Sequence, residues 1–375
     1  MLSYHLHMVG TAHAPKHRQV YEALLQQIVS GRVKAGGRLP SEADLVHRFG
    51  ASRITVARAL RDLQVAGFVE RRAGSGTFVR QARRADQALS LGMVVPDFGD
   101  VEVFTPIYRG MLDAPEAQSH ALLWTTGAGT AATREDEAWL ACQQCVARRV
   151  DGVFFAPLEL TPNHRTVNRR IAEAFAAARI PVVLLDRSIE PYPQRGRHDL
   201  IGLDNRRAGA LVTSHLLNRG CQRVTFVGLS DAASSVDARE AGFREALALA
   251  GLTAQPDSVL RGDPSDALLV DALMRRYRPD GIVCASDRTA GALMRTLLVL
   301  GHGIPGQVRI GSIDDVEYAS LLPVPLTTLR QPCREIGIAA MSAMMSRVAQ
   351  PDLPPRDILL HGQLIVRAST GEAQD

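Results

Sequence analysis

Acidic and hydroxyl side chains follow several apolar segments of the chain, directly after each segment ends. Asp186 comes after Val182–Leu185, and Asp314 comes after a segment that ends at Ile313. If these segments are parallel strands, their carboxyl ends lie at one edge of a sheet, where crevices bind small ligands. Carboxylates there can accept hydrogen bonds from hydroxyl or amine groups, and a nearby arginine can hold a hydroxyl or an acid group. The candidate ligand-binding residues of this kind are Asp97, Asp186, Arg239, Ser286, Asp287 and Asp314.

These side chains also have a purely structural interpretation. A residue at a strand-to-helix turn can cap the helix by accepting a hydrogen bond from a backbone N–H. We expect this role for Asp204, while Asp186 and Asp287 remain open between a helix cap and a ligand contact. Arg239 and Asp314 are favoured as ligand contacts.

Other patterns that carry catalytic chemistry are missing from the sequence. We find no GxSxG elbow, P-loop, HExxH pair or GxGxxG turn, so we expect neither an enzyme nor a bound cofactor. Cys142 and Cys145 have the spacing of half a zinc site, but no second pair completes it. We interpret both as small residues on a partly buried helix, and we expect no metal.

A second group of polar and basic side chains stands near the N-terminus, on two short helical patterns at about 42–49 and 53–66. A tight turn at Gly50 joins the two patterns. Ser41 starts a capping box before the first, and Ser52 can cap the second. Two such helices predict a helix-turn-helix, in which the start of the second helix enters the major groove of DNA.

A β-hairpin follows these helices, with alternating apolar residues around a glycine-rich turn at 73–76. Its tip is small enough to approach the DNA backbone or the minor groove. Arginine can bind guanine, and serine or threonine can bind a phosphate or a base edge. The candidate DNA-binding residues of the helices and the hairpin are Ser41, Ser52, Arg53, Thr55, Arg58, Arg71, Arg72, Ser75 and Gly76.

The charge distribution supports a polyanionic partner for this region. Residues 16–84 hold fourteen lysines and arginines against five acids, so they carry +9 while the whole chain carries +4. A basic head on a mildly acidic body favours double-stranded DNA as the partner. Arg32 and Arg38 are open between DNA contact and simple solvation.

From residue 89 onward, strand-like apolar segments alternate with helical segments. This alternation predicts an α/β fold with parallel sheets, and the number of units favours two Rossmann-like lobes with a ligand cleft between them. The overall class is thus α/β, with an N-terminal winged helix-turn-helix. The expected organisation is a disordered tail at 1–14, a DNA-binding domain at 15–80, a linker at 81–88, and an effector domain at 89–375, with lobe 1 at about 89–198 and 329–355 and lobe 2 at about 199–328 and 356–370.

The N-terminal region resembles the winged-helix domain of the GntR family. The resemblance implies DNA contacts from Ser52, Arg53, Thr55 and Gly76. The chain departs from the common family pattern at Ala43 and Ala57, where many members have arginine. The match rests on Gly37-Arg38-Leu39-Pro40-Ser41-Glu42, Ser52-Arg53-Ile54-Thr55-Val56 and Gly74-Ser75-Gly76-Thr77-Phe78-Val79.

The body resembles the lac-repressor and galactose-repressor family, whose core is similar to periplasmic sugar-binding proteins. The resemblance implies that the chain crosses between lobes near 198, 328 and 355. It also implies ligand contacts from Asp186, Arg239, Ser286, Asp314 and Gln331. Ser286 departs from the asparagine that is common at its position. The match rests on Val150-Asp151-Gly152-Val153, Ile180-Pro181-Val182, Asp186-Arg187, Asp204-Asn205, Pro279-Asp280-Gly281, Ser286-Asp287 and Pro325 to Pro332.

Together these features predict a cytoplasmic, ligand-responsive transcriptional regulator. We expect a homodimer that binds a pseudo-palindromic operator. A small sugar-like effector is expected to release it from DNA, and the alternative is an effector that acts as a co-repressor. No apolar run reaches the length of a membrane span, and no membrane partner is expected. Two alternatives stand beside this interpretation: a sensor or scaffold whose winged helix binds protein, and an α/β enzyme.

Overall fold

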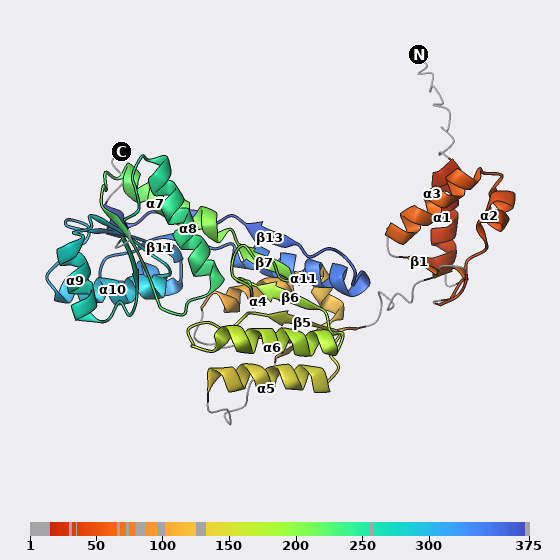
Figure 1. Ribbon diagram of the computed structural model, residues 1–375, viewed down its shortest axis with the longest axis horizontal. Helices are drawn as coiled ribbons and strands as arrows, with labels where there is room; N and C mark the ends of the chain where they lie inside the picture. Colours follow the sequence, from red (N-terminus) through yellow and green to blue (C-terminus); the bar gives the residue numbers. More distant parts are fainter. Residues whose placement is uncertain are drawn as a thin grey trace, which may run out of the picture. The chain divides into compact units, whose positions relative to one another are not determined.

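The computed structural model (Figure 1) divides the chain into two compact units, Met1–Gln87 and Ala88–Asp375. It describes residues 16–29, 32–34, 36–65, 68–72, 75–79, 88–95, 102–124, 133–255 and 258–371. The expected tail at 1–14 and almost all of the expected linker lie outside the described residues. The two units are described separately below.

The N-terminal unit consists of three helices and a two-stranded antiparallel hairpin. Its core is formed by apolar residues that recur at helical spacing, among them Leu24, Leu45 and Leu60, which are almost completely buried. The hairpin is the wing, and it pairs Val69 with Val79. The elements are α1 (Lys16–Val29), α2 (Glu42–Phe49), α3 (Arg53–Val65), β1 (Val69–Arg72) and β2 (Gly76–Val79).

The helix ends in this unit form where the sequence predicts them. The Ser41 hydroxyl accepts a hydrogen bond from the Asp44 backbone N–H at 3.2 Å, and the Asp44 carboxylate accepts one from the Ser41 backbone N–H at 3.0 Å. This is the predicted capping box. Gly50 ends α2 in the left-handed conformation with φ of 55°, which glycine adopts without strain. The Lys16 ammonium donates to the Gly50 carbonyl at 2.6 Å and so ties α1 to the turn.

The first lobe of the C-terminal unit is a six-stranded sheet with strand order β13-β7-β6-β5-β3-β4, in which all pairs are parallel. Helices α4 and α11 cover one face, and α5 and α6 cover the other. Neighbouring residues of β5 therefore face opposite cores, with Phe154 in one and Phe155 in the other. The elements are β3 (Ser90–Val94), α4 (Phe104–Asp113), β4 (Ala121–Trp124), α5 (Arg134–Ala147), β5 (Gly152–Phe155), α6 (His164–Ala177), β6 (Val182–Leu185), β7 (Asp199–Leu203), α11 (Cys333–Ala349) and β13 (Asp357–Leu360).

The second lobe is also built on a six-stranded sheet, with strand order β14-β12-β11-β10-β8-β9. Only the β12–β14 pair is antiparallel. Helices α7 and α8 pack on one face and α9 and α10 on the other. The elements are α7 (Asn205–Asn218), β8 (Val224–Gly228), α8 (Ser234–Leu249), β9 (Val259–Arg261), α9 (Ala267–Arg276), β10 (Gly281–Cys284), α10 (Asp287–Val299), β11 (Arg309–Asp314), β12 (Thr327–Arg330) and β14 (Gln363–Ile365).

The described part of the chain passes between the lobes three times. Each crossing lies a few residues later than the sequence predicted. The crossings follow β7, β12 and β13, so they lie at about 204, 331 and 361 instead of 198, 328 and 355. Strands β7 and β13, expected in lobe 2, belong to lobe 1. Each continues the hydrogen-bonded ladder of the first sheet to its last residue, and apolar content alone does not tell which sheet a strand will join.

The cysteines have the structural role that was predicted for them. Cys142 and Cys145 are buried on α5 against the sheet of lobe 1. Burial raises the pKa of Cys142 to about 12, which keeps its thiol protonated. No helix among the described residues is long and apolar enough to cross a membrane.

Candidate functional site

The start of α3 presents polar and basic side chains to solvent. Ser52 and Arg53 are exposed there, and Arg58 follows on the next turn. The Ser52 hydroxyl accepts a hydrogen bond from the Thr55 backbone N–H at 3.2 Å, so it caps the helix as predicted. Ile54, between Arg53 and Thr55, is 83% exposed and lies on the same helix start. Sequence periodicity missed Ile54, although its polar neighbours were a usable signal.

The wing arginines have partners inside the N-terminal unit. Arg71 forms an ion pair with Glu42, which joins β1 to the start of α2. The Arg72 guanidinium lies 2.6 Å from a Glu70 carboxylate oxygen and 4.6 Å from the centre of the Phe78 ring. Both side chains are about half exposed, so solvent screens these pairs and a phosphate can compete with the acids.

The tip of the wing requires a glycine. Gly76 has φ of 113°, and a Cβ there would lie 2.8 Å from the Arg38 Nε atom. Arg38 reaches this point because the segment before α2 runs along β2, where the Leu39 N–H donates to the Thr77 carbonyl at 2.8 Å. Arg38 and the exposed Ser75 therefore lie beside the wing tip.

In the C-terminal unit, the close packing of α7 on α8 positions Arg239. A Cβ on Gly209 would clash with the Arg239 carbonyl oxygen, and a Cβ on Gly242 would clash with the Arg206 carbonyl oxygen. Glycine at both places lets the two helix backbones touch. The Arg239 side chain is 4% exposed and points into the cleft between the lobes.

Arg239 is the centre of a buried polar network. Its Nε donates to the Asn205 Oδ1 atom at 2.8 Å, and its Nη1 donates to the Ala285 carbonyl. Its Nη2 lies 3.4 Å from the Asp314 carboxylate. Asp314 in turn accepts a hydrogen bond from the Gln331 side-chain amide at 2.7 Å. A charged group buried this deeply is stable only with such partners.

Two features of this network leave capacity for a ligand. The Gln331 Oε1 atom is buried without a hydrogen-bond partner. Asp314 and Asp186 both have positive φ, at 134° and 67°, which is strained for residues other than glycine. Burial raises the pKa of Asp186 to about 6, and the pKa of Asp314 is raised for the same reason, with Arg239 opposing both shifts. Unmet hydrogen-bonding capacity and strained backbone together are typical of binding sites.

The structure gives Ser286 and Asp287 roles that differ from those predicted from the sequence. Ser286 is the N-cap of α10, and its hydroxyl accepts from the Thr289 N–H at 3.2 Å. Asp287 is neither the cap nor a residue of the cleft wall. Its carboxylate accepts hydrogen bonds from the Val316 N–H at 3.0 Å and the Thr328 hydroxyl at 2.6 Å, and burial raises its pKa to about 7. Asp287 therefore holds the loop after β11 in place.

The structure shows where most of the other predicted residues lie. Asp204 caps α7 by accepting from the Arg207 N–H at 3.0 Å, as expected. Asp97 lies outside the described residues. The structure brings five predicted side chains to one cavity of about 110 Å³: Asp186, Arg239, Ser286, Asp314 and Gln331.

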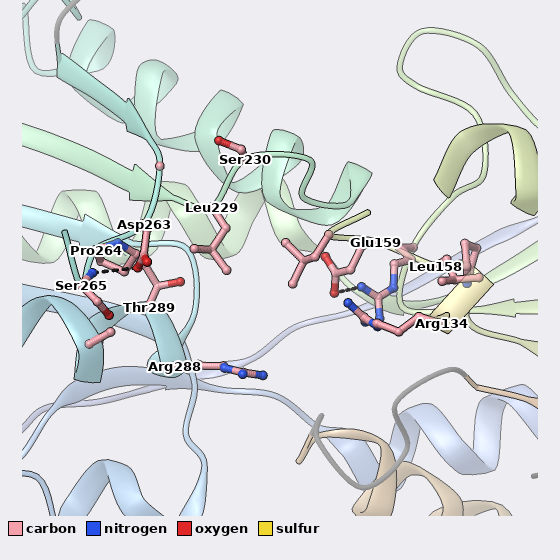
Figure 2. Close-up of a pocket in the computed structure, with 15 residues that line it drawn as sticks. Arg134, Leu158, Glu159, Leu229, Ser230, Asp263, Pro264, Ser265, Arg288 and Thr289 are labelled. Carbon is pink, nitrogen blue, oxygen red and sulfur yellow. Dashed lines mark hydrogen bonds and ion pairs between the residues drawn. The ribbon is translucent and has the colours of Figure 1, made fainter. Parts of the chain in front are cut away.

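A larger outer cavity of about 670 Å³ adjoins this inner one, and several residues line both (Figure 2). Arg187 is 5% exposed and forms an ion pair with Glu159. Arg134 from lobe 1 and Arg288 from lobe 2 point toward each other across the cavity. Sequence reasoning missed all four. Arg187 and Arg288 gave a signal, since each directly follows an aspartate at a strand end.

Comparisons with known proteins support the assignments of both the N-terminal and the C-terminal unit. The family of bacterial regulatory proteins called gntR matches residues 16–79, and the periplasmic binding protein-like domain matches residues 213–370. The arabinose metabolism transcriptional repressor of Geobacillus stearothermophilus is 25% identical over 370 residues, which is 96% of this chain and 98% of that protein. The protein of the same name from Halalkalibacterium halodurans is 26% identical over 381 residues, 96% of this chain and 97% of its own length.

Solved structures share the fold. A complex of the transcriptional regulator CelR with cellobiose has a TM-score of 0.63 at 21% identity and covers 94% of this chain and 98% of its own. A LacI family regulator from Enterococcus faecium with bound ribose has a TM-score of 0.59 at 23% identity and covers 75% of this chain and 98% of its own.

These findings confirm both resemblances drawn from the sequence, together with the α/β fold class. The two arabinose repressors named above are regulators and not enzymes, which removes the enzyme alternative. The chain therefore consists of a GntR-family DNA-binding domain joined to a periplasmic-binding-protein-like domain, and it is a transcriptional regulator.

Proposed function

We propose that this chain is a repressor that binds operator DNA as a homodimer and leaves it when a small sugar or sugar derivative occupies the cleft. The observation that carries the proposal is the polar network of Arg239, Asp314 and Gln331 in a cleft between two lobes. The arabinose repressors, the cellobiose complex and the ribose complex support a sugar as the ligand class. Because operator DNA lies in the bacterial cytoplasm, we expect the protein to act there.

On the DNA side, Arg53 and Arg58 are the proposed base-reading arginines. Arginine gives bidentate contacts to guanine in the major groove. Ile54 adds an exposed apolar surface that fits a thymine methyl group. The remaining proposed contacts position the domain on phosphates: Ser41, Ser52 and Thr55 from the helix starts, and Arg71, Arg72, Ser75 and Gly76 from the wing.

On the effector side, the carboxylates of Asp186 and Asp314 accept hydrogen bonds from sugar hydroxyls, and Arg239 donates to a sugar oxygen. Ser286 and Gln331 complete the set from the two edges of the inner cavity. Asp97, which follows β3 in the sequence, remains a proposed contact.

The cleft is coupled to the rest of the effector domain through the crossings between lobes. Gln331 lies between β12 of lobe 2 and α11 of lobe 1, so a ligand that engages it acts on one of the three connections. A ligand that prefers the closed arrangement shifts the population toward it. In a dimer, closure changes the spacing of the two DNA-binding domains, and the operator is released.

Operator selection with the full chain from randomised and genomic DNA tests the DNA half. We expect a pseudo-palindromic site, and sedimentation of the complex should give two chains per duplex. The affinity should fall steeply with salt, because each neutralised phosphate releases counterions. A flat salt response would instead support a winged helix that binds protein.

A thermal-shift panel of pentoses, hexoses, disaccharides and their derivatives tests the effector half. A compound that binds only the folded state raises the melting temperature. The proposal requires at least one sugar or sugar derivative that raises the melting temperature and also lowers affinity for the selected operator. A panel in which no compound does both would contradict it.

A further inference from the structure

The outer cavity carries a concentration of arginines that a neutral sugar does not need. Arg134, Arg187 and Arg288 all line it, and they come from α5, the turn after β6, and α10. Arg187 is the most buried and is paired with Glu159. Its Nε atom has no hydrogen-bond partner but lies 3.6 Å from the Asp186 carboxylate. The acid of the opposite wall, Asp263, is engaged in its own turn, where it accepts from the Ser265 N–H at 2.8 Å.

Each of these arginines adds positive electrostatic potential at the positions of the others. Burial, followed by the nearby charges of Arg239 and Arg134, lowers the pKa of Arg187 to about 9. Burial also lowers the pKa of Arg134, and Arg288 contributes to that shift across the cavity. Glu135 and Glu137, beside Arg134 on its own helix, oppose the shift without cancelling it.

Arg288 is the arginine with the fewest neighbours of opposite charge. It is exposed at the first turn of α10, and among the described residues no carboxylate lies within ion-pair distance of it. Glu102 lies near enough to interact with it electrostatically: burial and the Asp314 charge raise the pKa of Glu102, and the Arg288 charge lowers it. Figure 2 shows the Arg288 side chain extended into the cavity toward Arg134.

The inner cavity has more acids: Glu102, Glu159, Asp186 and Asp314 line it together with Arg187, Arg239 and Arg288. Asp186 and Asp314 flank Arg239 there, and Gln331 offers an unpartnered oxygen. The cleft is therefore divided into an inner part that suits hydroxyl groups and an outer part that suits an anion. The two parts share lining residues, among them Arg187 and Arg288, so one ligand can span both.

We propose that the effector is an anionic sugar derivative, with a phosphate or carboxylate between Arg134 and Arg288 and its hydroxyls in the inner cavity. The inference rests on the proposed function and narrows its ligand class. Arginine suits phosphate and carboxylate because its planar donors bind two oxygens at once.

This placement also gives the ligand a reason to close the cleft. Arg134 belongs to lobe 1 and Arg288 to lobe 2, so closure brings two like charges together, which costs free energy. An anion held between them converts that repulsion into attraction on both sides. The ligand then has the preference for the closed arrangement that a population shift requires.

The test uses the full-length chain and matched sets of probes: ribose, ribose 5-phosphate and ribonate; glucose, glucose 6-phosphate and gluconate; and inorganic phosphate alone. Binding is measured by calorimetry, and operator release is measured by fluorescence anisotropy. We expect the phosphate or the acid of at least one set to bind about 10- to 100-fold more tightly than its neutral parent, the range for hydrogen bonds to charged groups. The separate phosphate and acid arms identify which anion the site takes.

Variants assign the effect to the arginines. Arg288→Gln and Arg134→Gln should each lower affinity for the anionic probe much more than affinity for its neutral parent, so that most of the anionic advantage is lost. Arg295→Gln is the matched control, because Arg295 is exposed on the same helix α10 and does not line the cavity. Both cavity arginines reach solvent, so the variants are expected to fold.

Two results would overturn the inference in different ways. If a neutral sugar binds as tightly as its phosphate and acid and still releases the operator, the inference fails while the proposed function stands. If no probe binds but a neutral sugar of the thermal-shift panel binds and releases the operator, the inference fails and the proposed function stands; if no compound of that panel does so either, both fail. Binding of inorganic phosphate that competes with the anionic sugar and is lost in Arg288→Gln would support the outer cavity as the anion subsite.

Discussion

The side-chain amide of Gln331 donates a hydrogen bond to the carboxylate of Asp314 over 2.7 Å. This bond joins the end of β11 to the crossing between β12 and α11, so it links the ligand network of lobe 2 to a connection between the lobes. The same carboxylate lies 3.4 Å from Arg239. A ligand that displaces or strengthens the Gln331–Asp314 bond therefore acts on the cleft and on the connection together.

Gln331→Ala removes that bond and leaves Asp314 with one partner fewer. We expect the free energy of unfolding to fall by about 1 kcal/mol, the usual net value of one hydrogen bond. Effector affinity should fall at least severalfold, because Gln331 also loses its ligand-facing oxygen. Urea unfolding and calorimetry measure the two effects. Gln143→Ala, at an exposed position of α5, is the control, and equal behaviour of the two variants would contradict the role of Gln331.

Arg53→Ala should reduce affinity for the selected operator about 10- to 100-fold, which corresponds to the 1–3 kcal/mol of one bidentate base contact. Affinity for unrelated DNA should fall much less, and the melting temperature of the chain should not change, because Arg53 is exposed. Anisotropy titrations with both duplexes give the ratio. Arg295→Ala removes the same charge far along the sequence and serves as the control. If the operator and unrelated DNA weaken equally, Arg53 contacts only phosphates.

Gly76→Ala tests the wing tip. The residue has φ of 113°, and its new methyl group would press on the Arg38 guanidinium. A left-handed conformation costs a residue with a Cβ roughly 1–2 kcal/mol, so the tip should rearrange and DNA affinity should fall. Effector binding should be unchanged. An operator affinity equal to that of the unmodified chain would show that the wing tip does not contact DNA.

Asp186 should make stability depend on pH in a particular direction. Its pKa is about 6 in the folded chain and about 4 when unfolded, so the folded state binds more protons between these values. Protonated Asp186 therefore stabilises the folded chain at pH 4. This contribution to the free energy of unfolding is lost as the pH rises from 4 through 6. The free energy of unfolding of Asp186→Asn minus that of the unmodified chain should therefore be about 1–3 kcal/mol larger at pH 8 than at pH 4.

Urea unfolding of both chains at pH 4, 6 and 8 measures this difference. Parallel pH profiles would show that the carboxylate of Asp186 is not desolvated in the folded chain. Effector affinity should fall below pH 6 in the unmodified chain, since a protonated carboxyl accepts fewer hydrogen bonds from hydroxyl groups. Asp186→Asn should lose that part of the pH dependence.

Much of the fold could be predicted because its strands are continuous apolar segments and its helices begin at recognisable caps. The Ser41–Asp44 capping box and the Asp204 cap are local features, so the sequence was sufficient for them. The crossings were placed too early because β13 alternates between exposed and half-buried residues, and its pairing with β7 is a long-range contact. Apolar content carries no information about such a partner.

The proposed effector site was predicted in part for the same physical reason. Asp186, Arg239 and Asp314 stand at strand ends or helix starts, where the topology of parallel sheets gathers side chains. Arg134 and Arg288 sit in the first turns of α5 and α10, which are distant in sequence and come from different lobes. Only the folded arrangement shows that they face one cavity. Asp287, left open between a helix cap and a ligand contact, instead holds the loop after β11, because its partners Val316 and Thr328 come from other elements.

The most direct test of the account is whether a sugar in the cleft controls DNA binding in the same chain. Anisotropy of a labelled operator duplex is measured while the sugar with the largest thermal shift is added to the unmodified chain and to Asp314→Asn. We predict that the sugar weakens operator binding of the unmodified chain at least about tenfold, a coupling of about 1.4 kcal/mol. Asp314→Asn should bind the operator equally well and fail to respond. A sugar that binds in the cleft yet leaves operator affinity unchanged, or an Asp314→Asn chain that responds normally, would contradict the account.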